Sequence, residues 1–226
     1  MGKTKQAAGS VPCLGQGVSN AGPPLFLESV KAKDGLYHNV PYHEKRMRRA
    51  LASVNLALGS PLGGMLPKPP SEGLFKARVI YPLPDGGASV ELVPYSIPAM
   101  DTLQAVDAPG LSYPHKYLDR AALTALKEGS PASEIIICVG GRVTDATIAN
   151  LVLECPSGLY TPERPLLLGT KREGLLKGGI VKEADIRVSD LGDFERVFLV
   201  NAMLDLEDDV SVPMGRVLLP KGLRSQ

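Results

Sequence analysis

The sequence predicts an α+β protein built from two parts. We expect a small N-terminal α/β domain over residues 25–100 and a larger, barrel-like α/β domain over residues 110–226. In the first part, hairpin signals flank a single amphipathic helix, which is typical of a small sheet covered by a helix. In the second part, a strand becomes a near-continuous apolar run, which indicates burial on both of its faces.

The first domain opens with a predicted strand at residues 25–30. Asp34-Gly35 is a strong hairpin signal, and the return strand starts at residues 36–37. Residues 42–58 predict an amphipathic helix that ends near residue 59. Its apolar side chains recur at i, i+4, i+7 and i+11, at Met47, Leu51, Val54 and Leu58.

A loop and a second hairpin complete the first domain. Residues 59–73 are rich in Gly and Pro and predict the loop. Strands are expected at 74–83 and 88–97, joined by a turn signal at 84–87. Residues 97–112 are expected to be a linker, which places the domain boundary there.

The second domain is predicted from apolar runs separated by glycine turns. A helix is expected from Asp119, a buried strand at 134–139, and a further strand region at 142–154. A short helix follows Gly169 and stops at Gly178-Gly179. The last strands fall within 184–191 and 196–203, and we expect mostly antiparallel pairing.

Composition and charge exclude several classes of protein. The chain has 226 residues, 44% hydrophobic and 22% charged, which is ordinary for a soluble globular protein. The net charge of +1 gives no indication of a nucleic-acid partner, and no apolar run has the length of a membrane span. Residues 1–24, rich in Gly, Ser and Pro, are expected to be a disordered tail.

The cysteines and histidines indicate neither a disulfide framework nor a metal site. The three cysteines are unclustered, which makes a reducing cytoplasm the expected location. The three histidines lack paired ligand spacing, so no zinc site is predicted. These six residues are Cys13, Cys138, Cys155, His38, His43 and His115.

The residues that could carry chemistry have ordinary interpretations when each is taken alone. Lys116 and Arg49 could be solvated cations, and Asp145 could cap a turn. Arg78 could face solvent from a half-buried strand, and Gly169-Thr170 could simply start a helix. Only their order along the chain favours a common site.

That order resembles the class IV aminotransferase family, the pyridoxal-phosphate enzymes of fold type IV. The resemblance runs from about residue 25 to residue 203. Its most specific segments are KYLDRAAL, RVTDATIANLVL followed by LYTP, and LLLGTKRE. The family contains branched-chain aminotransferases, D-amino-acid aminotransferases and aminodeoxychorismate lyases. It implies the two-domain fold of type IV, pyridoxal 5'-phosphate as cofactor, and a homodimer.

The resemblance also implies roles for individual residues. Lys116 matches the lysine that binds the cofactor covalently and moves the substrate's α-proton. Asp145 matches the acidic partner of the pyridine nitrogen, which is usually a glutamate in the family. Arg49 and the Gly169-Thr170 turn match groups that bind the cofactor phosphate.

Further matches concern the phosphate side and the substrate. Asn201-Ala202 matches a second phosphate-side turn, where the lyase branch carries Asn-Ala and the aminotransferases carry Gly-Thr. Asn150 matches an asparagine that follows the acidic residue, with a packing role equally open. Arg78 and Glu28 align with positions near the substrate, but the usual N-terminal strand and D-R-x-x-x-x-G-D/E-G segment are missing.

Three functions follow from the resemblance. The first is an aminodeoxychorismate lyase-like activity that releases pyruvate and p-aminobenzoate, favoured by Lys-x-Leu-x-Arg at 116–120 and by Asn201-Ala202. The second is an aminotransferase for branched-chain or D-amino acids. The third is a degenerate, non-catalytic member, which the missing segment motivates. The partner in the first two cases is a small-molecule substrate, without nucleic acid or membrane.

Overall fold

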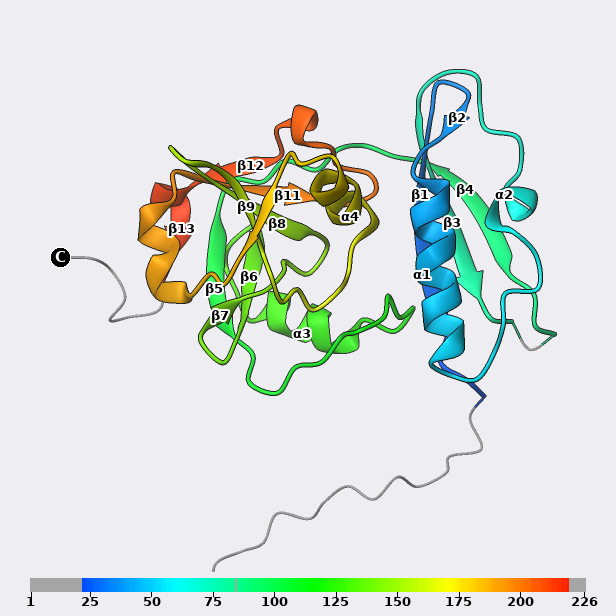
Figure 1. Cartoon of the computed structure of the whole chain (residues 1–226), viewed down its shortest axis with the longest axis horizontal. Helices are drawn as coiled ribbons and strands as arrows, with labels where there is room; N and C mark the ends of the chain where they lie inside the picture. The colour runs from blue at the N-terminus through cyan, green and yellow to red at the C-terminus, as the bar shows by residue number, and fades with distance from the viewer. Residues whose placement is uncertain (1–21, 84, 220–226) are drawn as a thin grey trace, which may run out of the picture.

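The computed structural model describes residues 22–83 and 85–219, so most of the predicted N-terminal tail lies outside the described residues. These residues form two lobes that lie side by side (Figure 1). The N-terminal lobe carries a four-stranded sheet in the order β2-β1-β3-β4. The C-terminal lobe carries a five-stranded sheet, β10-β9-β8-β11-β12, and a second four-stranded sheet, β13-β5-β6-β7. The α+β prediction is confirmed.

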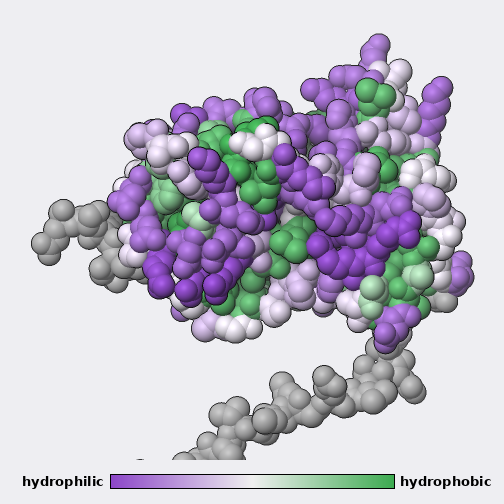
Figure 2. All heavy atoms as spheres, viewed as in Figure 1, coloured by the Kyte–Doolittle hydropathy of each residue, from purple (hydrophilic) through white to green (hydrophobic). Residues whose placement is uncertain are grey.

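The N-terminal sheet follows the predicted hairpins. β1 (Phe26–Lys33) turns at Asp34 and Gly35, which both have positive φ, into β2 (Leu36–Tyr37). β1 pairs along its whole length with antiparallel β3 (Leu74–Tyr81), and β3 pairs with β4 (Ser89–Pro94). Helix α1 (Val40–Ala52) packs its Met47 side against this sheet. Hydrophilic side chains gather over the outer side of α1 (Figure 2).

Helix α1 is shorter than the sequence predicted. The predicted helix reached residue 58, whereas α1 ends at Ala52. Asn55 takes the left-handed conformation at φ 60°, and the amide of Leu56 donates to the carbonyl of Leu51. Asparagine tolerates this conformation at a helix end, so the helix stops before the Gly-Pro signal is reached. The loop at 59–73 contains one short helix, α2 (Leu62–Met65).

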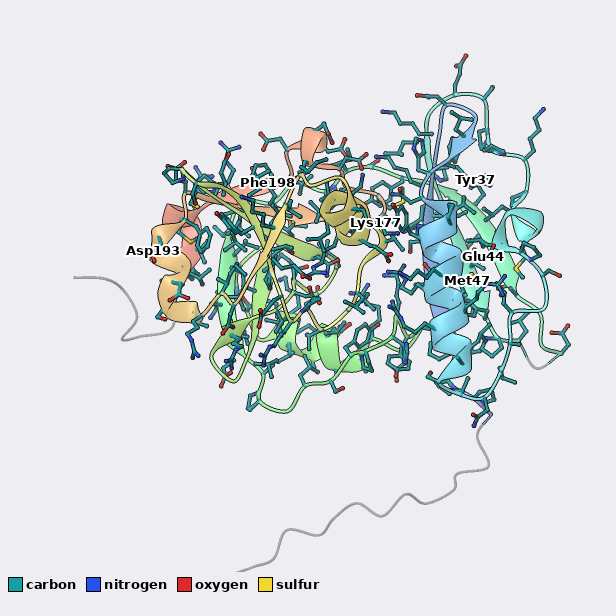
Figure 3. All side chains as sticks on the ribbon, in the orientation of Figure 1. Tyr37, Glu44, Met47, Lys177, Asp193 and Phe198 are labelled. Atoms are coloured by element: carbon teal, nitrogen blue, oxygen red, sulfur yellow. The ribbon has the colours of Figure 1, made fainter. Side chains whose placement is uncertain are left out.

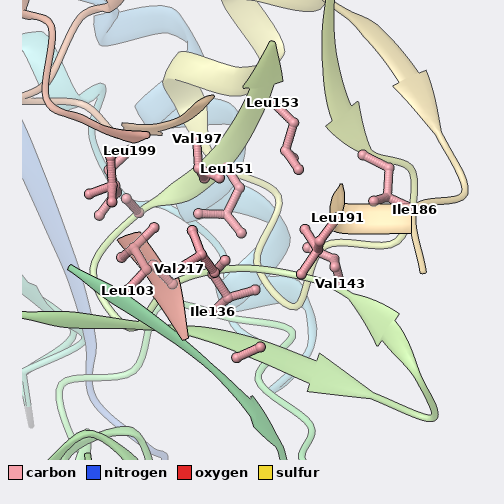
Figure 4. Close-up of a cluster of buried hydrophobic side chains, with 14 of the residues drawn as sticks. Leu103, Ile136, Val143, Leu151, Leu153, Ile186, Leu191, Val197, Leu199 and Val217 are labelled. Atoms are coloured by element: carbon pink, nitrogen blue, oxygen red, sulfur yellow. The ribbon is translucent and has the colours of Figure 1, made fainter. Parts of the chain in front are cut away.

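The two C-terminal sheets pack face to face around one core (Figure 4). Ile136 of β6 (Glu134–Val139) and Leu151 of β8 (Asn150–Cys155) lie in this core. The alternate residues of β6, Ile135 and Ile137, pack instead with Leu123 of α3 (Ala121–Glu128). The predicted burial of β6 on both faces is therefore confirmed.

Most strand pairs are antiparallel, as predicted, but three pairs among the described residues of the C-terminal lobe are parallel. β5 (Leu103–Asp107) runs parallel to β6, and β13 (Val217–Leu218) runs parallel to β5. β10 (Lys182–Ala184) is parallel to β9 (Gly158–Pro162). Strands that pair in parallel are far apart in sequence, so no local turn signal indicates the pairing.

Strand β5 also changes the expected linker. Residues 97–112 were predicted to connect the domains, yet β5 is an integral strand of the C-terminal lobe. The connection between the last strand of one lobe and the first of the other is therefore residues 95–102. The predicted strand region at 142–154 is likewise divided into β7 (Arg142–Val143), a loop and β8.

Helix α4 (Thr170–Lys177) covers the outer face of the five-stranded sheet and faces the other lobe. Its Leu175 packs with Val152 of β8 and Val200 of β11 (Arg196–Val200). On its other side, Lys177 lies over the ring of Tyr42 of α1, 4.8 Å from the centroid. Figure 3 labels Lys177 on α4 and Met47 on α1. The remaining elements are β12 (Ser211–Pro213) and 3₁₀ turns at Val188–Asp193, Leu206–Asp208 (η2) and Met214–Arg216. Among the described residues, no helix is long and apolar enough to cross a membrane.

Candidate functional site

A cavity of about 230 Å³ lies between the lobes and brings together most of the predicted site residues. It is lined from the N-terminal lobe by α1, β1, β3 and the residue after β4. From the C-terminal lobe it is lined by the segment before α3, the 145–150 loop and the turns that precede α4 and follow β11. The side chains used below are Ser29, Arg46, Lys76, Tyr95, Tyr113, Lys116, Arg120, Asp145, Asn150, Gly169, Thr170, Asn201 and Ala202.

Lys116 is fixed at the boundary of the two lobes. The amide of Leu27 donates to the Lys116 carbonyl at 2.8 Å, and the amide of Leu118 donates to the Leu25 carbonyl at 2.8 Å. The segment therefore adds to the edge of the N-terminal sheet beside β1. Burial, helped by the nearby cations Arg46 and Arg120, lowers the pKa of Lys116 to about 7. A large fraction of its amine is neutral and nucleophilic at neutral pH.

Asp145 lies in the loop between β7 and β8 and is only 4% exposed. Its Oδ1 accepts from Asn150 Nδ2 at 2.7 Å, and its Oδ2 accepts from the amide of Leu167 at 2.8 Å. Burial nevertheless raises the pKa of Asp145 to about 7, because these hydrogen bonds offset only part of the desolvation. A cationic group beside it would favour the ionised carboxylate.

Gly169 and Thr170 form a polar cradle at the start of α4. A Cβ on Gly169 would lie 1.8 Å from Asn150 Oδ1, so only glycine lets the chain pass this close to Asn150. Thr170 is 2% exposed, and its Oγ1 has no hydrogen-bond partner among the described residues. The first amides of α4 are unpaired within the helix, and together with this hydroxyl they suit an anionic ligand.

Asn201 and Ala202 line the cavity in the turn after β11. Asn201 Oδ1 accepts from the amides of Met203 and Leu204, and its Nδ2 donates to the Ile148 carbonyl at 3.0 Å. The asparagine side chain is therefore used to hold the turn and to join it to the 145–150 loop. The Ala202 backbone is left at the cavity wall.

The cavity is lined by Arg46 of α1 and not by Arg49, the arginine that the sequence analysis selected. The two are three residues apart on one helix, and the sequence KRMRRAL does not distinguish them. Arg46 is 6% exposed and donates from Nε and Nη2 to both oxygens of Glu28, at 2.9 and 2.5 Å. Burial lowers the pKa of His115, and the charge of Arg49 lowers it further.

Glu28 lies behind the cavity wall rather than in it. It is fully buried and also accepts from His43 Nδ1 at 2.6 Å. Burial alone would raise its pKa, but Arg46 and His43 outweigh burial and hold the pKa of Glu28 at about 2. The predicted place near the substrate is thus not where the structure puts Glu28, which instead orients Arg46.

Arg78 is also outside the cavity lining. It donates from Nη1 to Glu91 Oε2 of β4 at 3.1 Å at the surface. Lys76, two residues earlier on the same face of β3, lines the cavity and lies 5.4 Å from the ring centroid of Tyr95. Lys76 has no carboxylate within ion-pair distance among the described residues.

Five residues that line the cavity were not predicted as site residues from the sequence: Arg46, Lys76, Tyr95, Tyr113 and Arg120. Arg120 was quoted in the Lys-x-Leu-x-Arg motif, which was a usable signal, and its Nη2 donates to the Thr147 carbonyl at 2.7 Å. Because side chains two residues apart on a strand share a face, the choice of Arg78 could also have indicated Lys76. Four of the lining side chains are basic and only one is a carboxylate, a balance that suits an anionic ligand.

Comparison with known proteins identifies the family of this chain. The profile of the amino-transferase class IV family matches residues 89–206. An uncharacterised protein of Haemophilus influenzae is 31% identical over 186 residues, covering 80% of this chain and 97% of its own. The crystal structure of a candidate 4-amino-4-deoxychorismate lyase from Haemophilus somnus is 28% identical. It covers 80% of this chain and 96% of its own, with a TM-score of 0.73.

A more distant structure shares the fold. The pyridoxal-phosphate-bound form of a hypothetical aminotransferase from Mycobacterium tuberculosis is 19% identical, with a TM-score of 0.63, covering 86% of this chain and 85% of its own. The profile match covers more than half of the chain and includes Lys116, Asp145, Gly169 and Asn201. The chain belongs to the class IV aminotransferase family.

Proposed function

We propose that this protein is a pyridoxal-phosphate-dependent enzyme whose covalent lysine is Lys116. The observation that carries the proposal is a half-buried lysine, with its pKa near 7, that lines the same cavity as a buried carboxylate. A lysine amine must be neutral to attack an aldehyde, and burial next to Arg46 and Arg120 supplies that condition near pH 7.

The residues present fit the cofactor's phosphate at one end of the cavity. The unpartnered Thr170 hydroxyl, the first amides of α4 and the close approach at Gly169 leave room and donors for an anion. We assign Arg46, in place of Arg49, as the arginine on this side, because Arg46 lines the cavity and is held in orientation by Glu28. The turn at Asn201-Ala202 would add backbone donors.

Asp145 fits the cofactor's ring nitrogen. Its carboxylate is buried and oriented by Asn150 and Leu167, and a cationic ring nitrogen would supply the opposite charge that it lacks. When bound, the cofactor supplies an electron sink for the substrate's α-carbon. Lys116 Nζ would accept the α-proton, because its lowered pKa allows it to act as a base near neutral pH.

We infer that the substrate is an anionic amino compound and that the activity is of the aminodeoxychorismate lyase type, releasing pyruvate and p-aminobenzoate. Lys76 and Arg120 line the cavity without carboxylate partners among the described residues and could bind substrate carboxylates. The name of the Haemophilus somnus relative, at 28% identity, supports this choice over an aminotransferase. We also expect the homodimer that the family resemblance implies.

Loading and reduction with borohydride test the cofactor assignment. Purified protein is incubated with pyridoxal phosphate, and its absorbance above 380 nm is recorded before and after borohydride, followed by peptide mass spectrometry. We expect a band that borohydride removes and a cofactor mass on the peptide containing Lys116. The Lys116→Ala variant should show neither. A reduced adduct on another lysine, or no band in the wild type, would refute the proposal.

Product analysis tests the reaction. The loaded enzyme is given aminodeoxychorismate, and p-aminobenzoate and pyruvate are measured. Parallel reactions contain branched-chain or D-amino acids with 2-oxoglutarate, and glutamate is measured. We expect p-aminobenzoate and pyruvate in equal amounts. Glutamate formation without p-aminobenzoate would replace the lyase by an aminotransferase.

A further inference from the structure

Asp205 joins three segments that form the cavity, although it does not line the cavity itself. Its Oδ2 accepts from Lys31 Nζ of β1 at 2.6 Å, and its Oδ1 pairs with Lys171 in the first turn of α4. Asp208 Oδ2 accepts the Asp205 amide at 2.8 Å and lies 3.6 Å from Lys31 Nζ. One carboxylate therefore contacts both lobes.

Each segment that Asp205 joins carries cavity residues next to the contact. On β1, Ser29 lies on the same face as Lys31, two residues earlier. On α4, Thr170 directly precedes Lys171. Asp205 itself follows the turn at 201–204, in which Asn201 and Leu204 exchange two backbone hydrogen bonds at 3.2 Å. A shift of Asp205 would move this turn.

The Asp205 carboxylate balances the positive charges of the lysines at this junction. Lys31 is 4% exposed and lies directly opposite Lys76 in the β1–β3 ladder, which places two lysines side by side. Although burial raises the pKa of Asp205, the ammonium groups of Lys171 and Lys31 hold it below its ordinary value. Asp205 thus neutralises Lys31, and of these two lysines only Lys76 lines the cavity.

We propose that Asp205 is a positioning residue that fixes the phosphate cradle of α4 and the turn after β11 against the N-terminal lobe, through Lys171 and Lys31. This inference rests on the proposed function. Its consequence is that cofactor affinity depends on a charge that never touches the cofactor. Because Asp205 is partly exposed, the effect of its charge decreases as salt is added.

The test compares the dissociation constant of pyridoxal phosphate for wild-type protein, Asp205→Asn and Glu173→Gln. Glu173 of α4 pairs with Lys45 of α1 at 2.7 Å, so this control also removes one carboxylate charge from a contact between the lobes. We expect Asp205→Asn to raise the dissociation constant about tenfold at 50 mM sodium chloride, and this ratio should fall at 500 mM. Glu173→Gln should stay within twofold of wild type.

Two further measurements separate positioning from loss of stability. In a Lys31→Met background, Asp205→Asn should raise the dissociation constant less than threefold, because the contact across the lobes is already lost. Amide hydrogen exchange should increase at 168–173 and 201–205 in Asp205→Asn and stay unchanged in β6. Equal affinities of wild type and Asp205→Asn would overturn this inference alone. A wild type that binds no pyridoxal phosphate would overturn the proposed function and this inference with it.

Discussion

Replacing Lys116 by methionine should stabilise the cofactor-free protein, and the gain should depend on pH. An unfolded chain keeps the lysine proton up to about pH 10.5, whereas the folded chain releases it near pH 7. Unfolding therefore takes up a proton between these values, and the free energy of unfolding of the wild type falls as the pH falls from 10.5 toward 7. Methionine carries no proton and has no such dependence.

The magnitude follows from the fall in pKa. The pKa of Lys116 falls by about 3.5, and one pKa unit corresponds to about 1.36 kcal/mol. Keeping this lysine charged in the folded protein therefore costs about 5 kcal/mol of unfolding free energy at and below pH 7. The Lys116 residue is half-buried, so solvent screens part of this cost and about 5 kcal/mol is its upper limit. At pH 9 about 2 kcal/mol of it remains. The difference in unfolding free energy between Lys116→Met and wild type should thus narrow by up to about 2–3 kcal/mol between pH 7 and pH 9.

Urea denaturation followed by circular dichroism at pH 7, 8 and 9 measures this difference, since the chain contains no tryptophan. Lys45→Met is the matched control, because the Lys45 side chain is 60% exposed and its pair with Glu173 lies at the surface. We expect the control to change stability by less than about 1 kcal/mol at every pH. A pH-independent difference for Lys116→Met would show that Lys116 keeps its proton in the folded protein up to pH 9, and would refute the lowered pKa.

Three further predictions concern the cofactor end of the cavity. Arg46→Lys, which keeps the charge and loses the two-pronged geometry, should weaken pyridoxal-phosphate binding about tenfold, and Arg49→Lys should leave it unchanged in the same titration. Gly169→Ala should abolish binding by displacing the Asn150 side chain, 1.8 Å from the new Cβ. Gly174→Ala, with its nearest contact at 3.9 Å, should bind normally and melt slightly higher. Wild-type affinity for the cofactor should rise between pH 6 and pH 8 as Asp145, with its pKa near 7, ionises; Asp145→Asn should reduce this rise, and parallel profiles would contradict the role of Asp145.

The local signals in the sequence predicted much of the secondary structure. Hairpin chemistry at Asp34-Gly35 and the apolar run at 134–139 depend on neighbouring residues alone, and both were confirmed. Strand β5 could not be found in this way, because its partners β6 and β13 come later in the chain and pair with it in parallel. The end of α1 was misplaced because Asn55, rather than a glycine, takes the left-handed conformation.

The site residues also divide into those that local sequence pattern predicted and those that it did not. Lys116, Asp145, Gly169, Thr170, Asn201 and Ala202 were predicted and all line one cavity, since each stands in a segment whose spacing carries the family resemblance. The sequence could not distinguish between neighbouring basic residues on one helix or one strand, because the rotation of the helix and the face of the strand decide which side chain reaches the cavity. Arg46 and Arg49 differ only by 3 positions on one helix, and Lys76 and Arg78 by 2 on one strand.

The sequence by itself determined the family, the order of the cofactor residues and the kinds of element that carry them, because these are properties of local pattern. Only the tertiary structure decided which cation faces the cavity, and it did so through pairing. Glu91 holds Arg78 at the surface, while Glu28 orients Arg46. It also lowered the pKa of Lys116, because burial is a property of the folded chain as a whole.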